Sequence, residues 1–523
     1  MNNALHYRNG LAATVLAAWL LAGCSGGGGG GGGSSSTPPP PVATFTDPNV
    51  YSSAPGASLA SPNENTAVTQ HSITLNGTTL NYTATAGHLT ARTLGSATGA
   101  AQASFFYVAY TLNGSNPATR PVTFFYNGGP GSASVWLHLG SFGPKRLATG
   151  IPATTAAAPF PLVDNAQTLL DVSDLVFVDA VGSGYSQAIA PNTNQSFWGV
   201  DADATVFRDF VMRYAAVFNR GASPKFLYGE SYGGPRAAVM ALLLESAGTR
   251  LAGVVLQSPA MNYNANCGVV ATPTLSCAPY LPSYAAAGAW HNVATPSPAP
   301  EAIPAYMADM RQLATTQYHP AVQTVLAGGN PPLPLITQLV SATGMSQAGW
   351  IARFNMTAPF FRGNLINGQL LGRYDARIAA ASNSALASEG DPSQTFIGSS
   401  FASTIATYLA NTLQFTTPST YVMSSNAINT WNFSHNGRQV PDTIPDLAGA
   451  IALNPQLKVL AVGGYHDLAT PFFITEQDLA RLGNNPNVQV KTYMGGHMTF
   501  LDDASRVAQR ADLAQFYQST IAQ

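Results

Sequence analysis

Apolar residues follow two different patterns along the chain. From about His71, the runs HSITLNG and TLNYTATAG predict a β-hairpin around Gly77, and ASFFYVAYTL and PVTFFYNGG predict two more strands. Later runs are short and almost wholly apolar, at 175–181, 225–229, 251–259 and 457–464. Such runs are typical of strands that are buried on both faces, as in parallel sheets covered by helices.

Helical patterns separate the first three of these buried strands. They cover residues 201–220 and 235–248, and strands that alternate with helices indicate an α/β fold with a mostly parallel sheet. The residues from 261 to 420 contain no comparable apolar strand. We therefore predict a fold core at 65–260 and 421–523, with a helical cap inserted at 261–420 and antiparallel strands at the N-terminal side of the sheet.

Composition narrows the class of protein. The chain has 523 residues, of which 46% are hydrophobic and only 9% charged, and its net charge is −2. A large apolar core is therefore expected. The absence of a basic cluster argues against a nucleic-acid partner.

The N-terminus has the features of an export signal. His6 and Arg8 precede an apolar run that ends in Leu21-Ala22-Gly23-Cys24, and this run is too short to span a bilayer. The ending resembles a bacterial lipobox, so we expect a signal peptide at 1–23 and lipidation of Cys24. An ordinary signal peptide with a chance cysteine is the alternative.

Glycine, serine and proline dominate the residues that follow, so 24–45 is expected to be a flexible tether between a membrane anchor and a folded body. The predicted location is the periplasmic side of a membrane, with the outer membrane favoured. Because export leads to an oxidising compartment, Cys267 and Cys277 are expected to form a disulfide. Metal binding is the alternative, but no histidine or second cysteine pair lies at ligand spacing.

The stretch FLYGESYGG places Ser231 between glycines, after a predicted strand and before a predicted helix. This is the sequence context of a nucleophile elbow, a sharp turn that exposes a serine hydroxyl above the sheet. Gly229 and Gly233 supply the small neighbours that such a turn requires. Ser231 is therefore the candidate nucleophile.

A nucleophilic serine needs a histidine base and an acid that orients it, and in α/β-hydrolases these follow in the order Ser, Asp, His. Asp467 and His497 each follow a predicted strand end. His466 and His435 are the rival bases, and each is expected to be a surface or packing histidine. Glu476 and Asp478 fall in the next predicted helix and are expected to face solvent.

The stretch FFYNGGPGSAS is the second glycine-rich segment. It is either a simple turn or an oxyanion-hole loop, in which tightly turned backbone brings N–H groups close to a developing negative charge. In the second case the donors are the N–H groups of Gly129 and Tyr232. A phosphate-binding loop is excluded because neither nucleotide-binding glycine pattern is present in this segment. No cofactor and no metal site is predicted.

The stretches NGGPGSAS, LVFVDAVGSGYS, GESYGG and GGHM together resemble the serine carboxypeptidase family, from about His71 to the C-terminus. The resemblance implies an α/β-hydrolase fold, a triad of Ser231, Asp467 and His497, and release of C-terminal residues from peptides with a free C-terminus. It also implies that Asn127 and Glu230 hold the terminal carboxylate of the substrate. Glu230 must then be protonated, as burial would favour; an exposed glutamate near the helix terminus is the alternative.

The sequence departs from many family members at three positions. Tyr126 replaces a tryptophan, Ser132 replaces a cysteine, and Ser141 stands where eukaryotic relatives have a second glutamate. The last change puts a shared-proton carboxyl pair in doubt.

Beside the carboxypeptidase, an esterase or acyltransferase with the same triad remains open, because a fold does not fix a substrate. A binding protein with an inactive hydrolase fold is the third reading, and the intact triad argues against it. Side-chain preference and oligomeric state are not predictable from the sequence.

Overall fold

The computed structural model describes residues 42–269 and 274–521. All of them belong to one compact unit, Pro38–Gln523. The predicted signal peptide, Cys24 and most of the predicted tether lie outside the described residues. None of the helices in the described part of the chain is both long and apolar enough to cross a membrane.

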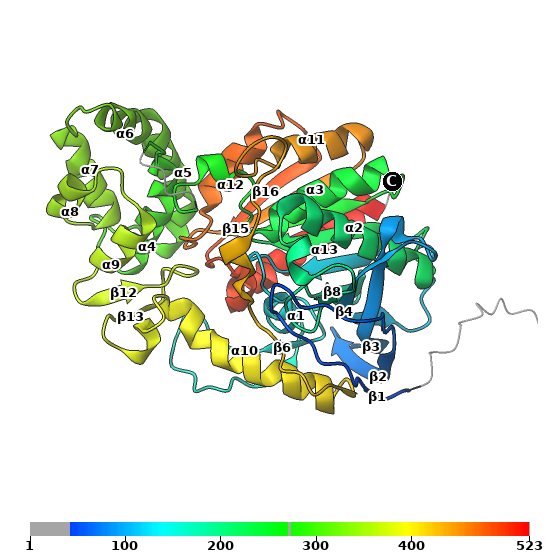
Figure 1. The fold of residues 1–523 in the computed structure, drawn as a ribbon. Helices are drawn as coiled ribbons and strands as arrows, with labels where there is room; N and C mark the ends of the chain where they lie inside the picture. Colours follow the sequence, from blue (N-terminus) through cyan, green and yellow to red (C-terminus); the bar gives the residue numbers. More distant parts are fainter. Residues whose placement is uncertain (1–41, 270–273, 522–523) are drawn as a thin grey trace, which may run out of the picture. The chain divides into compact units, whose positions relative to one another are not determined.

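A 10-stranded sheet forms the centre of the molecule (Figure 1). Its parallel part consists, in order across the sheet, of β16 (Val488–Tyr493), β15 (Lys458–Gly464), β11 (Gly253–Gln257), β10 (Lys225–Glu230), β5 (Val122–Tyr126) and β8 (Asp174–Val178). The antiparallel part continues with β4 (Ala101–Leu112), β3 (Thr78–Arg92) and β2 (Thr66–Leu75), and the short β9 (Gln187–Ala188) pairs with β4. The predicted mixture of parallel and antiparallel strands is confirmed.

The hairpin between β2 and β3 turns at Asn76 and Gly77, whose φ angles are 49° and 80°. Two consecutive positive φ values are typical of the type I′ turn, whose twist matches that of the flanking strands. Small two-stranded sheets lie outside the main sheet: β1 (Phe45–Thr46) with β14 (Phe415–Thr416), β6 (Lys145–Leu147) with β7 (Leu162–Asp164), and β12 (Gln369–Leu371) with β13 (Ala379–Ala381).

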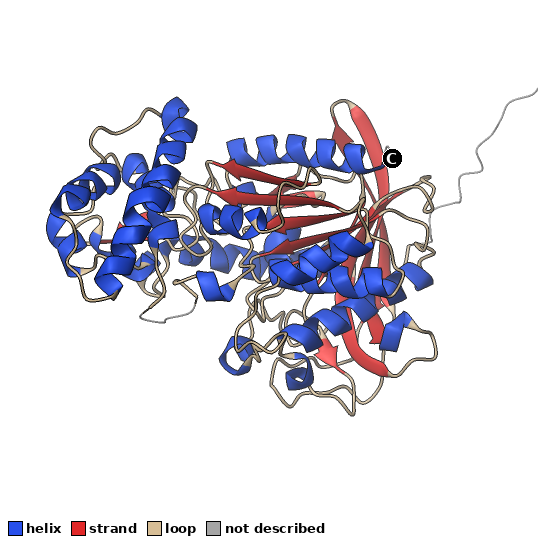
Figure 2. Ribbon diagram, turned by 90° about the horizontal axis from the view of Figure 1, so that it is seen from above, coloured by secondary structure: helices blue, strands red, loops and turns tan. Residues whose placement is uncertain are grey.

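Helices cover both faces of the parallel strands (Figure 2). Within β5, Phe124 and Tyr126 belong to one apolar cluster and Phe125 to another, because successive side chains point to opposite faces. The first cluster includes residues of α2 (Val200–Val217), α3 (Gly233–Ser246) and α11 (Ile444–Leu453). The second includes residues of α1 (Val135–Gly140), α10 (Pro392–Asn411) and α13 (Asp503–Ile521). This two-sided burial explains why the parallel strands are apolar throughout.

Between β11 and β15, the described residues contribute no strand to the main sheet. The chain instead forms α4 (Leu281–Trp290), α5 (Ile303–Leu313), α6 (His319–Leu326), α7 (Leu333–Thr343), α8 (Gln347–Ala352) and α9 (Ala358–Asn364). These helices gather beside the sheet in Figure 1 and share a third apolar cluster, which also includes residues of α12 (Phe472–Ala480). We call α4 to α9 the cap. The later helix α10 packs on α1, where the Phe401 ring contacts the Trp136 ring with centroids 4.9 Å apart.

The order of the strands, the helices on both faces and the helical insertion make this an α/β-hydrolase fold, as the sequence predicts. Ligands of such sheets bind at the carboxyl ends of the parallel strands. The ends of β5, β10 and β15 therefore position the candidate site.

Candidate active site

Ser231 lies in the turn between β10 and α3, and its φ angle is 60°. A positive φ is strained for a residue with a side chain, and such strain is characteristic of a nucleophile elbow. A Cβ atom on Gly229 would lie 2.0 Å from the carbonyl oxygen of Gly233, and one on Gly233 would lie 2.9 Å from that of Tyr126. The close approach of the two chain segments explains why both neighbours are glycines.

A cavity of about 290 Å³ opens above this turn. Its lining residues come from the glycine-rich loop, α1, the elbow, the segment after β16, the first turn of α10 and the segments on either side of α10: Asn127, Gly128, Gly129, Ser132, Trp136, Glu230, Ser231, Tyr374, Gln394, Ser424, His497 and Met498. Ser231 is partly exposed to it. The structure thus brings together the predicted nucleophile, base and carboxylate-binding residues at one place.

His497 and Asp467 form a buried pair. His497 Nδ1 lies 2.8 Å from Asp467 Oδ2, and the side chain of each is at most 3% exposed. The other oxygen, Asp467 Oδ1, accepts hydrogen bonds from the backbone N–H groups of Ala469 and Thr470 at 2.7 and 3.0 Å. The carboxylate is therefore held in place, and it requires a proton on His497 Nδ1, which leaves Nε2 to act as the base.

Electrostatics and backbone contacts both define the state of His497. Burial disfavours its charged form, but the Asp467 carboxylate outweighs this effect and raises the pKa of His497 above its ordinary value. Its backbone N–H donates to the carbonyl oxygen of Tyr374 at 2.6 Å. Among the described residues, no hydrogen bond joins the side chains of Ser231 and His497, although both line the cavity. Such contacts are often loose before substrate binds.

The glycine-rich loop lies directly against the elbow. A Cβ atom on Gly128 would be 2.4 Å from the backbone nitrogen of Tyr232, so the two backbones are in contact. Within the part of the chain that the structure describes, the N–H groups of Gly129 and Tyr232 have no protein acceptor. Two unpaired N–H groups beside the serine are suited to stabilising an oxyanion.

Asn127 and Glu230 meet at the floor of the cavity. Asn127 Nδ2 donates to Glu230 Oε1 at 2.8 Å, while Asn127 Oδ1 accepts from the backbone N–H of Leu137 at 3.0 Å. Burial raises the pKa of Glu230 to about 7; His497 and the bond from Asn127 oppose the rise, and Asp467 adds to it. The second oxygen, Glu230 Oε2, is buried without a hydrogen-bond partner. This carboxyl group can therefore carry a proton on Oε2 and donate it to a bound molecule.

The rival histidines occupy other positions. His466 Nδ1 lies 2.7 Å from the carbonyl oxygen of Met494, and burial lowers the pKa of His466 to about 4. His435 lies between two carboxylates, Asp201 and Asp446. Neither histidine lines the cavity of Ser231.

The two acidic residues of α12 differ from each other. Glu476 forms a bidentate pair with Arg311, with both N–O distances at 2.7 Å. Asp478 was expected to face solvent, and this expectation is wrong, because its exposure is only 3%. The helix packs between the sheet and the cap, and burial raises the pKa of Asp478 to about 7.

The three departures from the family pattern are accommodated locally. Tyr126 is fully buried, and Ser132 Oγ accepts a hydrogen bond from Trp136 Nε1 at 3.1 Å. Ser141 Oγ donates to the carbonyl oxygen of Leu137 at 2.6 Å. Ser141 supplies no carboxyl group, so Glu230 has no second carboxyl group from this position with which to share a proton.

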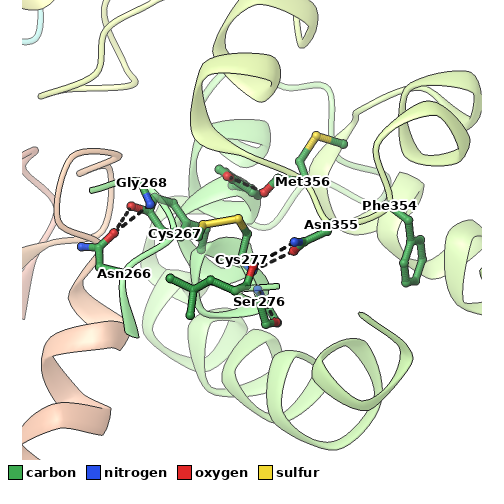
Figure 3. The surroundings of a disulfide bond; sticks show 12 residues. Asn266, Cys267, Gly268, Ser276, Cys277, Phe354, Asn355 and Met356 are labelled. Carbon is green, nitrogen blue, oxygen red and sulfur yellow. Dashed lines mark hydrogen bonds between the residues drawn. A yellow bond between two sulfur atoms is a disulfide. The ribbon is translucent and has the colours of Figure 1, made fainter. Parts of the chain in front are cut away.

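The structure joins Cys267 and Cys277 in a disulfide, with their Cα atoms 5.4 Å apart (Figure 3). Asn355, which follows α8, accepts a hydrogen bond from the backbone N–H of Cys277 and donates one to the carbonyl oxygen of Leu275, at 2.8 and 2.9 Å. The disulfide closes a short loop at the beginning of the insertion, and the hydrogen bonds of Asn355 tie that loop to a segment of the cap. The described residues contain no group of three or more histidine, cysteine or acidic side chains that could hold a metal ion.

Several cavity-lining residues have no motif that could have identified them. Tyr374 and Gln394 belong to the insertion, and Ser424 precedes α11. They lie in loop-like sequence or at a helix start, so only the tertiary structure assigns them to the site. Met498 was identifiable from its place beside His497.

Comparison with known proteins supports the motifs over part of the chain. Residues 76–269 match the family model for serine carboxypeptidases. The match includes the glycine-rich loop and the elbow, and Asp467 and His497 lie outside it. No curated protein matches the sequence.

Solved structures of α/β-hydrolases resemble the chain over most of its length. The Kex1 prohormone-processing carboxypeptidase of Saccharomyces cerevisiae is 15% identical, with a TM-score of 0.49, and the alignment covers 84% of this chain and 91% of that one. A proline iminopeptidase of Mycobacterium smegmatis is 16% identical, with a TM-score of 0.36 and coverages of 83% and 99%. A putative aryl esterase of Burkholderia cenocepacia is 13% identical, with a TM-score of 0.32 and coverages of 84% and 100%. None of these similarities is close enough to say what this chain acts on, and it is the segment 76–269 that is similar to the serine carboxypeptidases.

Proposed function

We propose that this protein is a serine carboxypeptidase that releases C-terminal residues from peptides with a free C-terminus. The observation that carries the proposal is the Asn127–Glu230 pair, which lies in the same cavity as Ser231 and His497. A protonated Glu230 and the amide of Asn127 both donate hydrogen bonds, and a terminal carboxylate accepts them. An esterase for neutral substrates has no use for a buried carboxylic acid beside its nucleophile.

The proposed reaction proceeds through an acyl-enzyme. Ser231 Oγ attacks the last peptide carbonyl while His497 Nε2 takes its proton, and the oxyanion receives hydrogen bonds from the N–H groups of Gly129 and Tyr232. As the C–N bond breaks, His497 returns the proton to the leaving amine, which departs as a free amino acid. Water, deprotonated by His497, then hydrolyses the ester and restores Ser231.

The ionisation of Glu230 provides a test of whether the enzyme recognises a terminal carboxylate on its substrate. Above a pKa of about 7, Glu230 is ionised and repels a terminal carboxylate in a cavity with little solvent. For a free peptide, kcat/KM should therefore fall as pH rises through 7, and by up to about tenfold per pH unit beyond the pKa. The matching peptide amide lacks the charge and should lose much less. His497 must be neutral to act as the base, so it sets the acidic limb for both substrates.

The experiment measures kcat/KM from pH 5.5 to 9 for one peptide and its amide. Glu230→Gln keeps a donor at every pH and should make the peptide-to-amide ratio independent of pH. Glu476→Gln, the same replacement at the Arg311 pair, is the matched control and should behave as the wild type. A wild-type ratio that stays constant would contradict the role of Glu230. Hydrolysis of esters without any hydrolysis of peptides would instead favour the esterase or acyltransferase.

We also propose that the chain is an exported lipoprotein with its lipid on Cys24. Support comes from the sequence Leu21-Ala22-Gly23-Cys24 and the glycine- and serine-rich residues after it. The mature protein should begin at Cys24 and carry acyl groups, which mass spectrometry of the intact chain detects. Cys24→Ser should move the protein from the membrane fraction to the soluble fraction or leave it unprocessed. An unmodified N-terminus at another residue would contradict the proposal.

A further inference from the structure

Thr470 is a buried threonine whose hydroxyl group contacts both members of the His497–Asp467 pair. Its Oγ1 lies 3.0 Å from His497 Nδ1 and 2.8 Å from Asp467 Oδ2, and the residue is only 5% exposed. It belongs to the segment between β15 and α12, and it does not line the cavity of Ser231. Any effect of this hydroxyl group on the reaction must therefore pass through His497 or Asp467.

The neighbours of the hydroxyl group determine which atoms donate. The Asp467 carboxylate requires a proton on His497 Nδ1, so this N–H has two oxygen atoms within reach, Asp467 Oδ2 and Thr470 Oγ1. A hydroxyl oxygen can accept a hydrogen bond while its own proton is donated elsewhere. That proton has acceptors in Asp467 Oδ2 and in the carbonyl oxygen of Ser258, both 2.8 Å away. Thr470 can thus accept from His497 and donate to a neighbour at the same time.

Ser258, the residue after β11, holds this arrangement from behind. Its φ angle is 43°, which is strained for a residue with a side chain, and such strain is common at active sites. Its carbonyl oxygen accepts the bond from Thr470, while its Oγ donates to the carbonyl oxygen of His497 at 2.7 Å. Its backbone N–H donates to the carbonyl oxygen of Val462 in β15, also at 2.7 Å. The edge of the sheet therefore anchors both Thr470 and His497 through one residue.

A second oxygen beside Nδ1 restricts the imidazole ring more than a single acceptor does, because the N–H must satisfy two directions at once. The restriction matters most during the proposed reaction. When Nε2 takes the proton of Ser231, the ring becomes positively charged, and hydrogen bonds from a charged donor are stronger than those from a neutral one. An interaction that strengthens in the transition state raises kcat and leaves substrate affinity unchanged.

We propose that Thr470 is a positioning residue of the triad, whose hydroxyl group keeps the proton of His497 on Nδ1 and leaves Nε2 facing the cavity. The proposal rests on the proposed acyl-enzyme reaction and adds one side chain to the triad. The role belongs to the hydroxyl group alone, so shape and hydrogen bonding can be tested separately. Valine keeps the shape of threonine without the hydroxyl group, and serine keeps the hydroxyl group without the methyl group.

The experiment measures kcat and KM for one peptide with the wild type, Thr470→Val and Thr470→Ser. Thr470→Val should lower kcat by about tenfold to a hundredfold, as expected for the loss of a hydrogen bond from a group that becomes charged. KM should stay close to the wild-type value, because Thr470 does not line the cavity. Thr470→Ser should restore most of the lost kcat.

Thr343→Val is the matched control. Thr343 ends α7 in the cap and is fully buried, and its Oγ1 donates to the carbonyl oxygen of Leu339 at 2.7 Å. The control should lower stability and leave kcat per active site, counted by titration with a fluorophosphonate, at the wild-type value. A double variant tests the coupling: because Thr470 acts through the buried pair, Thr470→Val should slow Asp467→Asn much less than it slows the wild type.

The other outcomes overturn the inference in recognisable ways. A wild-type kcat in Thr470→Val would contradict the role of Thr470 while leaving the peptidase intact. Equal losses in Thr470→Val and Thr470→Ser would assign the effect to packing of the methyl group, and a raised KM with unchanged kcat would assign it to substrate binding. If Thr470→Val does not fold, Thr470→Ala, which also lacks the hydroxyl group, takes its place. Failure of the wild type to cleave any peptide would contradict the proposed function itself, and the same variants compared on an activated ester would then test Thr470.

Discussion

His435 and His497 are both buried histidines that are paired with carboxylates, yet their surroundings differ. His435 lies between α10 and α11, and its Nδ1 and Nε2 lie 2.6 and 2.8 Å from oxygens of Asp201 and Asp446. His497 has one such partner, Asp467, on Nδ1. With both ring nitrogens occupied, His435 has no nitrogen that could take a proton from a substrate. With one nitrogen occupied, His497 keeps the other for the cavity.

The comparison shows that a histidine–carboxylate pair can serve a structural purpose in one place and a chemical purpose in another. Asp201 belongs to α2 and Asp446 to α11, so His435 ties the segment between α10 and α11 to two helices of the core. That segment also carries Trp431, whose ring contacts the Tyr232 ring with centroids 5.3 Å apart. The environment of Nε2 therefore distinguishes the candidate base from a histidine that holds the fold together.

The largest expected effect comes from removing the chemical groups. Ser231→Ala and His497→Ala should each lower kcat for a peptide by about 10⁶-fold, because each removes the nucleophile or its base. Ser231→Ala should keep the thermal midpoint of the wild type to within a few degrees, whereas His497→Ala should also lower stability, because it leaves the buried Asp467 carboxylate without its partner. Steady-state kinetics and thermal unfolding measure the two properties. Activity above a few per cent in Ser231→Ala would refute the assignment of the elbow.

Asp467→Asn should lower kcat by about 10⁴-fold, somewhat less than the loss of Ser231 or His497. Two backbone N–H groups bond Asp467 Oδ1, so the asparagine oxygen must take that place and its NH₂ group must face His497. The NH₂ group is a donor, so it selects the tautomer with the proton on Nε2, which is the wrong one for a base.

The matched control applies the same replacement to the other histidine. Asp446→Asn should lower stability, while kcat per active site, counted by titration with a fluorophosphonate, should stay close to that of the wild type. An equal loss of kcat in Asp446→Asn and Asp467→Asn would remove the distinction between the two histidines.

His435→Gln should reduce the free energy of unfolding by about 2 kcal/mol, because it leaves the buried Asp446 carboxylate without its cationic partner. The value is below the range for fully buried pairs because the second partner, Asp201, is 67% exposed. Denaturant unfolding measures the loss, and kcat per active site should change less than about twofold. A large loss of kcat with unchanged stability would instead place His435 in the chemistry.

The smallest expected effect is the pH dependence of the stability that His435 contributes to the fold. The hydrogen bond to Asp446 raises the pKa of His435 above its ordinary value of 6.5, burial opposes the rise, and Asp201 adds to it. The stabilisation is complete below the pKa of the unfolded chain and is lost as pH rises through the higher pKa of the folded protein. The stability difference between wild type and His435→Gln should therefore shrink as pH rises above 6.5. A difference that grows with pH would contradict a charged His435.

Sequence patterns predicted the fold class and identified the main residues of the candidate site. The parallel strands are recognisable because burial on both faces makes them continuously apolar, and a serine between glycines at a strand end has few structural explanations. Asp467 and His497 were identifiable because each follows a strand that reaches the same edge of the sheet. The catalytic roles of these residues stay a prediction until activity is measured.

Other features depend on contacts that no local pattern contains. Asp201 and His435 are separated by 234 residues in the chain, and His435 was expected to be a surface or packing residue. Asp478 was expected to face solvent, but it is buried beside Asn262 and Asp442, which are distant from it in the sequence.

The left-handed backbone of Ser231 has a consequence for how the protein tolerates change. A strained φ of this kind costs about 1–3 kcal/mol, which the rest of the fold must offset. Glycine would adopt the same turn without that cost, so the residue best for the proposed chemistry at position 231 is not the residue best for stability. Ser231→Gly would be expected to yield a protein that is more stable to unfolding and has lost its nucleophile, whereas Ser231→Ala keeps the strain. In a population under selection for stability alone, this position would be among the first to lose its serine.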